Sequence, residues 1–114
     1  MGMRIKTTSR LMEKARRSAI VSIARILNKK EFNGMEFNGE FKTCIEGNDL
    51  DCYDVRVNRV FLKGKCVMVE YDMLVDERCF DPEELEGFKG FQQPINILTS
   101  ATILTIWENM VGLD

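Results

Sequence analysis

The spacing of apolar residues changes partway along this chain, from a helical period to the period of a β-strand. Between residues 9 and 29 the apolar side chains recur every three or four positions and so share one broad face of a helix. From residue 53 to 75 they alternate with polar ones, as in strands that bury one face. A chain of 114 residues is expected to fold as a single domain over 1–114, with Met3 as the natural start and Met1-Gly2 added ahead of it.

The helix expected at 9–29 has an apolar face and a basic face. Only Arg16 interrupts the apolar side. Thr8 or Ser9 is expected to cap the helix start, because a hydroxyl there accepts a hydrogen bond from an otherwise unpaired backbone N–H. The apolar face comprises Met12, Ala15, Ala19, Ile20, Ile23, Ile26 and Leu27.

Three strands are expected after this helix. The first spans 35–45, where apolar residues keep a period of two. Asn38-Gly39 lies inside it and favours a bulge, although the same pair is also typical of the tip of a small hairpin. The second and third strands span 53–61 and 66–75, and together they form a hairpin.

The turn of this hairpin determines which residues face each other. A two-residue turn at Lys63-Gly64 would set Val57 opposite Glu70 and mix the apolar and polar faces. A three-residue loop that ends at Gly64 instead pairs Val57 with Val69, and it places glycine where such a loop needs a left-handed backbone. We therefore expect the three-residue loop.

The remaining segments predict a long connection and a second helix. Within 76–96, Asp81-Pro82 begins a short acidic helical turn, and Gly87 ends it. A connection of this length is often functional, and the alternative is a packed cover over one end of the sheet. Residues 97–111 are long for a strand, so a helix is expected there, although their isoleucines and threonines also favour strands.

These segments predict the fold class. It is α+β, with the order helix, three-stranded antiparallel meander, short acidic helical turn and C-terminal helix. One face of the meander is apolar and needs cover, so both helices are expected on one sheet face.

The sequence carries no recognisable pattern of catalytic or metal-binding residues. It contains no histidine, which removes Ser-His, Cys-His and His-metal chemistry, and its four cysteines include no Cys-x-x-Cys pair. We therefore expect no enzymatic activity, no catalytic or metal-ligating residue, no cofactor, and four reduced thiols. Reduced thiols, without a secretory or membrane-spanning segment, predict a cytoplasmic location and no membrane partner. The cysteines are Cys44, Cys52, Cys66 and Cys79.

Charge is divided unevenly along the chain. Residues 1–30 hold nine Lys/Arg and one Glu, whereas 31–114 hold seven basic and seventeen acidic residues, for a net charge of −2. The helix face opposite the apolar one carries Arg10, Lys14, Arg17 and Arg25. This basic face is suited to the phosphates of a nucleic acid. The alternative is a solvated face that is partly neutralised by the acidic segment of the same chain or of a neighbour. That acidic segment, which peaks at 70–86, is also able to imitate phosphates toward a basic partner.

Excess apolar surface predicts a protein partner. The apolar arc of 97–111 is wider than one sheet covers, and the outer sheet face near the hairpin tip carries further apolar residues. The expected partner patch comprises Val60, Leu62, Met68 and Trp107. The leading hypothesis is a non-enzymatic protein-interaction or regulatory module, with a homodimer as the commonest outcome. Nucleic-acid association through the basic helix face is the alternative hypothesis.

Overall fold

The structure, a computed structural model, describes residues 2–29, 35–36, 42–46 and 52–112, with side chains described at 10–29 and 54–112. Two long helices, five strands and three short helical turns follow one another along these residues. They are α1 (Gly2–Leu27), β1 (Met35–Glu36), β2 (Lys42–Glu46), β3 (Cys52–Lys63), β4 (Cys66–Met73), η1 (Glu77–Cys79), α2 (Pro82–Glu86), β5 (Phe91–Pro94), η2 (Ile95–Ile97) and α3 (Ser100–Val111).

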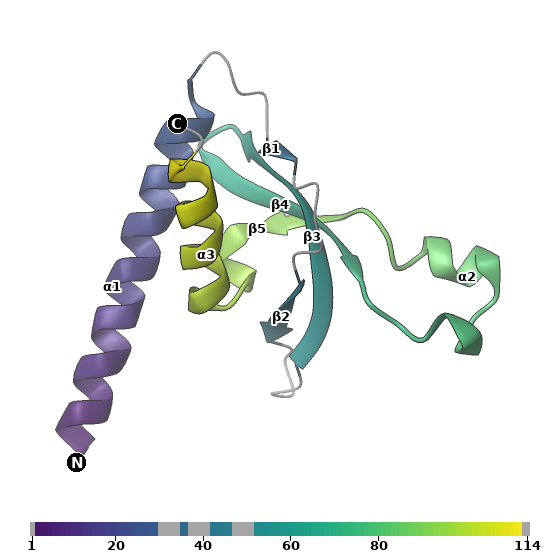
Figure 1. The fold of residues 1–114 in the computed structure, drawn as a ribbon, viewed down its shortest axis with the longest axis horizontal. Helices are drawn as coiled ribbons and strands as arrows, with labels where there is room; N and C mark the ends of the chain where they lie inside the picture. The colour runs from purple at the N-terminus through teal and green to yellow at the C-terminus, as the bar shows by residue number, and fades with distance from the viewer. Residues whose placement is uncertain (1, 30–34, 37–41, 47–51, 113–114) are drawn as a thin grey trace.

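The predicted α+β fold class is confirmed. The strands form one antiparallel sheet in the order β1-β3-β4-β5, and β2 pairs with β3 beside β1. Both long helices lie on the same side of the sheet (Figure 1). α3 runs alongside α1 in the same direction, and the N-terminal part of α1 extends beyond the start of α3.

The sheet contains more strands than the predicted meander. The expected first strand, 35–45, is two strands in the structure, because both β1 and β2 pair with β3. The chain from Met35 to Lys42 is longer than the stretch of β3 beside it, Val60 to Arg56, so one continuous strand does not fit. The Asn38-Gly39 pair that suggested a bulge lies outside the described residues. β5 was not predicted at all, and it pairs with the free edge of β4.

The predicted hairpin register is wrong. Lys63 faces Cys66, so the turn has two residues, Gly64 and Lys65, and Gly64 has the left-handed φ of 64°. Val57 faces Tyr71 rather than Val69. The faces still agree, because the register shifts between Val57 and Arg59, where a β-bulge inserts one extra residue.

The β-bulge determines which side chains of β3 face the core. Val57 and Val60 are three positions apart, which in a regular strand would place them on opposite faces, yet both are fully buried. The predicted inward residues Val55, Val57, Val69 and Tyr71 are confirmed. The helices complete the core from the other side with Ala19, Ile23, Ile26, Leu27, Ile103, Ile106 and Met110.

Both helix predictions hold in type but differ at their ends. α1 already begins at Gly2, so Thr8 and Ser9 lie inside the helix and do not cap it. α3 forms as a helix, and the side chain of Thr99 caps its start by accepting a hydrogen bond from the Thr102 backbone N–H. The guanidinium of Arg16 donates to the backbone oxygen of Asn96, which ties the middle of α1 to η2, just before α3.

The acidic turn is confirmed, but it is not a cover over the sheet. Asp81 and Glu84 form a capping box at the start of α2, Pro82 occupies the first turn, and Gly87 is the C-cap. η1 and α2 contain no buried residue and project away from the sheet, on the side opposite α1 (Figure 1). We call residues 76–89 the acidic lobe.

Candidate functional site

An apolar groove lies between α1 and α3. It has a volume of about 200 Å³ and is lined almost entirely by apolar atoms. Small side chains of α1 form one wall, and larger side chains of α3 form the other. The α1 wall comprises Ala15, Ser18, Ala19 and Ser22, and the α3 wall comprises Leu104 and Trp107.

The groove is continued at both ends by exposed apolar side chains. Leu11 lies one turn before Ala15 on the same side of α1, and 62% of it is exposed. Val111 lies one turn after Trp107 on α3, and 46% of it is exposed. Because the two helices run in the same direction (Figure 1), Leu11 near the start of α1 and Val111 at the end of α3 lie toward opposite ends of the groove. We call this surface, from Leu11 to Val111, the helix groove.

The predicted partner patch does not form one surface. Val60 is fully buried and Leu62 packs against the core, because the bulge after Val57 turns both toward the helices. Met68 is half-buried on the other face of the sheet, opposite Phe61. Trp107 lies apart from these residues and lines the helix groove.

The predicted basic face is present on α1. Arg10, Lys14, Arg17 and Arg25 are all exposed. Arg17 donates to Glu13 at 2.7 Å, and this contact holds the pKa of the Glu13 carboxyl below its ordinary value. In the described part of the chain no acidic side chain pairs with Arg10, Lys14 or Arg25. The half-exposed Val21 lies among them, and we call these five residues the outer face of α1.

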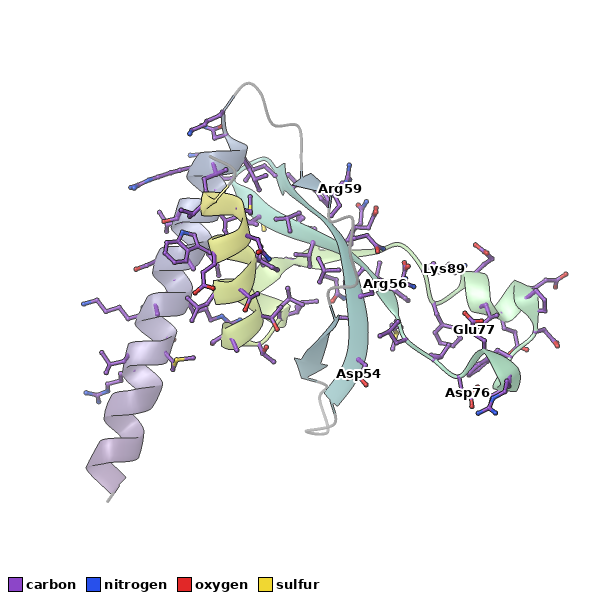
Figure 2. The ribbon with its side chains drawn as sticks, viewed as in Figure 1. Asp54, Arg56, Arg59, Asp76, Glu77 and Lys89 are labelled. Carbon is purple, nitrogen blue, oxygen red and sulfur yellow. The ribbon has the colours of Figure 1, made fainter. Side chains whose placement is uncertain are left out.

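The sheet face away from the helices is less suited to a partner. Arg59 lies over the Phe61 ring at 4.3 Å, and it faces Glu70 across the sheet. Arg56 faces Asp72 in the same way. The charges along this face therefore alternate and largely cancel, although the Nε atoms of both arginines are buried without a hydrogen-bond partner. Figure 2 shows Arg59 and Arg56 one after the other along β3, with Lys89 and Glu77 in the lobe beyond them.

The acidic lobe carries most of the remaining exposed charge. Asp76 accepts hydrogen bonds from the backbone and the guanidinium of Arg78 at 3.1 Å, and Arg78 thereby lowers the pKa of the Asp76 carboxyl. Glu86 and Lys89 lie 3.7 Å apart. The other acidic residues of the lobe are Glu77, Asp81, Glu83 and Glu84, and all are exposed.

Sequence reasoning missed the α1 wall of the groove, although a signal for it was present. Small residues recur at positions 15, 18, 19 and 22, which is the spacing of one helix face. Ala15 and Ala19 were assigned to the core face, and only Ala19 is buried. Small side chains on one flank of a helix let another helix approach closely, so the pattern indicates a packing surface as well as a core.

Comparisons with protein families, with curated proteins and with solved structures found no match to this chain. Among the described residues no helix combines the length and apolarity needed to cross a membrane. The same residues contain no group of three or more His, Cys, Asp or Glu side chains arranged to hold a metal ion.

Proposed function

We propose that this protein is a non-enzymatic protein-interaction module that binds an α-helical segment of another protein in the helix groove. The observation that carries the proposal is the apolar groove walled by Leu104 and Trp107, with the exposed Leu11 and Val111 one turn beyond the residues that line it. Of the four large apolar side chains that are more than one-third exposed among the described residues, two, Leu11 and Val111, lie next to this groove. Contiguous apolar surface of this kind marks interaction sites in folded proteins.

The shape of the groove favours a helix as its occupant. One wall is built from alanine and serine, so a helix backbone can lie close to it, and the other wall offers Leu104 and Trp107 as larger anchors. An amphipathic helix fills such a groove with side chains spaced three and four residues apart. The proposal also includes a cytoplasmic location, which is supported by the exposed free thiols of Cys66 and Cys79.

Trp107 is the single tryptophan of the chain and so reports directly on the groove. The probe is an 18-residue alanine-rich helical peptide with leucines along one face, and its control is the same composition with scrambled leucines. We expect the first peptide to shift the tryptophan emission to shorter wavelength in a saturable way. The scrambled peptide is expected to leave the emission unchanged.

The variant pair Leu11→Ser and Val111→Ser tests the position of the site, with Val21→Ser as a matched control on the outer face. Because burial of one leucine contributes about 1.5–3 kcal/mol, we expect the pair to weaken peptide binding roughly tenfold or more. The control has a similarly exposed side chain and is expected to bind like the wild type. Equal binding by all three proteins, or no emission change with either peptide, would contradict the proposal.

Nucleic-acid association through the outer face of α1 is the second candidate. It is supported by the exposure of all four predicted cations along one helix face. It is weakened by the absence of an aromatic side chain among these cations and by the overall net charge of −2. Retention of a duplex DNA fragment that falls steeply with added salt, and that is lost in the Lys14→Glu/Arg25→Glu variant, is the expected result if this candidate is correct.

A further inference from the structure

The outer face of α1 is a helix face without a partner in the described structure. Its cations are spread from Arg10 to Arg25, which corresponds to roughly 22 Å of helix at about 1.5 Å per residue. Beside its C-terminal end an open hollow of about 400 Å³ separates α1 from the hairpin turn. Val21 and Leu62 make part of this hollow apolar, and Arg25 and Lys65 add positive charge to its rim.

The acidic lobe is the complement of this face in charge. The lobe holds six carboxylates, between Asp76 and Glu86, against the two cations Arg78 and Lys89. The lobe is held in shape by its capping box and by edge-to-face packing of Phe80 on Phe88, with ring centroids 4.9 Å apart. The Met73 N–H also donates to the Phe88 oxygen at 2.7 Å, which anchors the base of the lobe to β4. A preformed lobe loses little conformational entropy when it binds.

The lobe and α1 of one molecule do not reach each other. α1 lies at one end of the molecule and the acidic lobe at the other, with the sheet between them (Figure 1). The two charged regions therefore remain uncompensated within a single chain. Because the net charge is only −2, repulsion between whole molecules is weak. The basic outer face of one molecule and the acidic lobe of another still attract each other.

We propose that the outer face of α1 binds the acidic lobe of a second copy of this chain. Each copy carries one face and one lobe, so two copies can satisfy both contacts in a two-fold pair, in which each lobe lies on the α1 of the other copy. The contact is mainly between exposed charges, so it is weak and is screened by salt. It uses a different surface from the helix groove and does not depend on the function proposed for that groove.

The test is a charge exchange followed by sedimentation equilibrium of the full chain at 20 mM and 500 mM NaCl. The lobe variant is Glu77→Lys/Glu83→Lys, which leaves the Asp81–Glu84 capping box intact, and the helix variant is Lys14→Glu/Arg25→Glu. A third protein carries all four changes. The matched control, Asp54→Lys/Glu108→Lys, alters the net charge as the lobe variant does but at exposed acids outside the lobe.

We expect the wild type and the control to associate at 20 mM NaCl and to dissociate at 500 mM. Each single-region variant is expected to associate at least about tenfold more weakly, because attraction at two positions becomes repulsion. In the four-change protein the exchanged residues carry opposite charges again, with glutamates on the helix and lysines in the lobe, so part of the association is expected to return. Thermal unfolding of each variant confirms that the fold is retained.

Three outcomes would overturn the proposal. The first is a wild type that stays monomeric at 20 mM NaCl, and the second is association that survives either single-region variant. The third is a four-change protein that stays monomeric while folded. A monomeric wild type that instead retains duplex DNA at low salt would assign the outer face to nucleic acid.

Discussion

Replacement of Val60 by threonine tests the β-bulge that sets the core side of β3. Val60 is fully buried and faces Val69, which is fully buried as well. Without the bulge after Val57, Val60 would point to the outer face of the sheet, where threonine is harmless. Threonine has nearly the shape of valine, so the substitution changes polarity without opening a cavity.

The expected cost follows from the burial of this side chain. A hydroxyl placed in an apolar environment without a hydrogen-bond partner costs roughly 1–3 kcal/mol in proteins. The Val60→Ala variant removes about two methyl-sized groups at about 0.8 kcal/mol each and leaves a cavity, so it is expected to cost about 2–3 kcal/mol. Either loss is a large part of the total stability of a small domain, which is roughly 5–15 kcal/mol.

Urea unfolding measures both losses, with Val21→Thr as the matched control. Val21 is half exposed on α1, so its replacement by threonine is expected to change the free energy of unfolding by no more than about 0.5 kcal/mol. The urea dependence of that free energy is expected to stay the same in all variants. A Val60→Thr protein as stable as Val21→Thr would refute the bulge and favour the register that places Val60 outside.

Two further predictions concern the sheet. Burial raises the pKa of the Tyr71 phenol, so the folded state favours the neutral ring, and stability is expected to fall as the pH rises above about 10. In Tyr71→Phe, which also loses the 3.0 Å hydrogen bond to Gln93, this decline is expected to be shallower in urea unfolding between pH 8 and pH 11. Gly64→Ala is expected to cost roughly 1–2 kcal/mol, because φ is 64° there while no atom lies near the new Cβ. Gly64→Asn is expected to cost less, since asparagine adopts a left-handed backbone more readily, and an equal loss would point to a cause other than φ.

The spacing of apolar residues was sufficient to predict the long helices and the inner face of the long strands. The residues of α1 from Ala19 to Leu27 that were expected to be buried are buried, apart from the half-buried Ile20. The alternation from Val67 to Tyr71 placed the inner face of β4 correctly. These segments are long enough that each position repeats the same signal, and tertiary packing reinforces it.

The start of α1 was predicted too late because its capping signal was ambiguous. Serine and threonine favour N-cap positions, but inside a helix they cost only a few tenths of a kcal/mol relative to alanine. Thr8 and Ser9 are therefore accommodated within α1, which continues back to Gly2. A local preference of this size does not stop a helix when good helix formers precede it.

The β-bulge and β5 could not be predicted from the alternation of apolar and polar residues. A single inserted residue reverses every later side chain of β3, and nothing in the order Val57, Asn58, Arg59 marks it. β5 has only four residues, and three of them are exposed, so it has no alternation to detect. Its pairing is a property of the free edge of β4, which exists only after the sheet has formed.

The β-bulge in β3 explains both why the predicted patch does not form and why the groove lies between the helices. Turning Val60 and Leu62 inward removes apolar surface from the outer sheet face and lets the sheet fill the core beneath the helices. With the sheet occupying that space, α3 buries Ile103, Ile106 and Met110, while Trp107 and Val111 stay on its flank beside α1. On α1, at about 100° per residue, Leu11 and Ser18 lie only about 20–60° around the helix from Lys14 and Arg25. The groove and the outer face are thus neighbouring sides of one helix, and the variants distinguish them by chemistry: Leu11→Ser and Val111→Ser change apolar side chains at the groove, whereas Lys14→Glu/Arg25→Glu change only cations of the outer face.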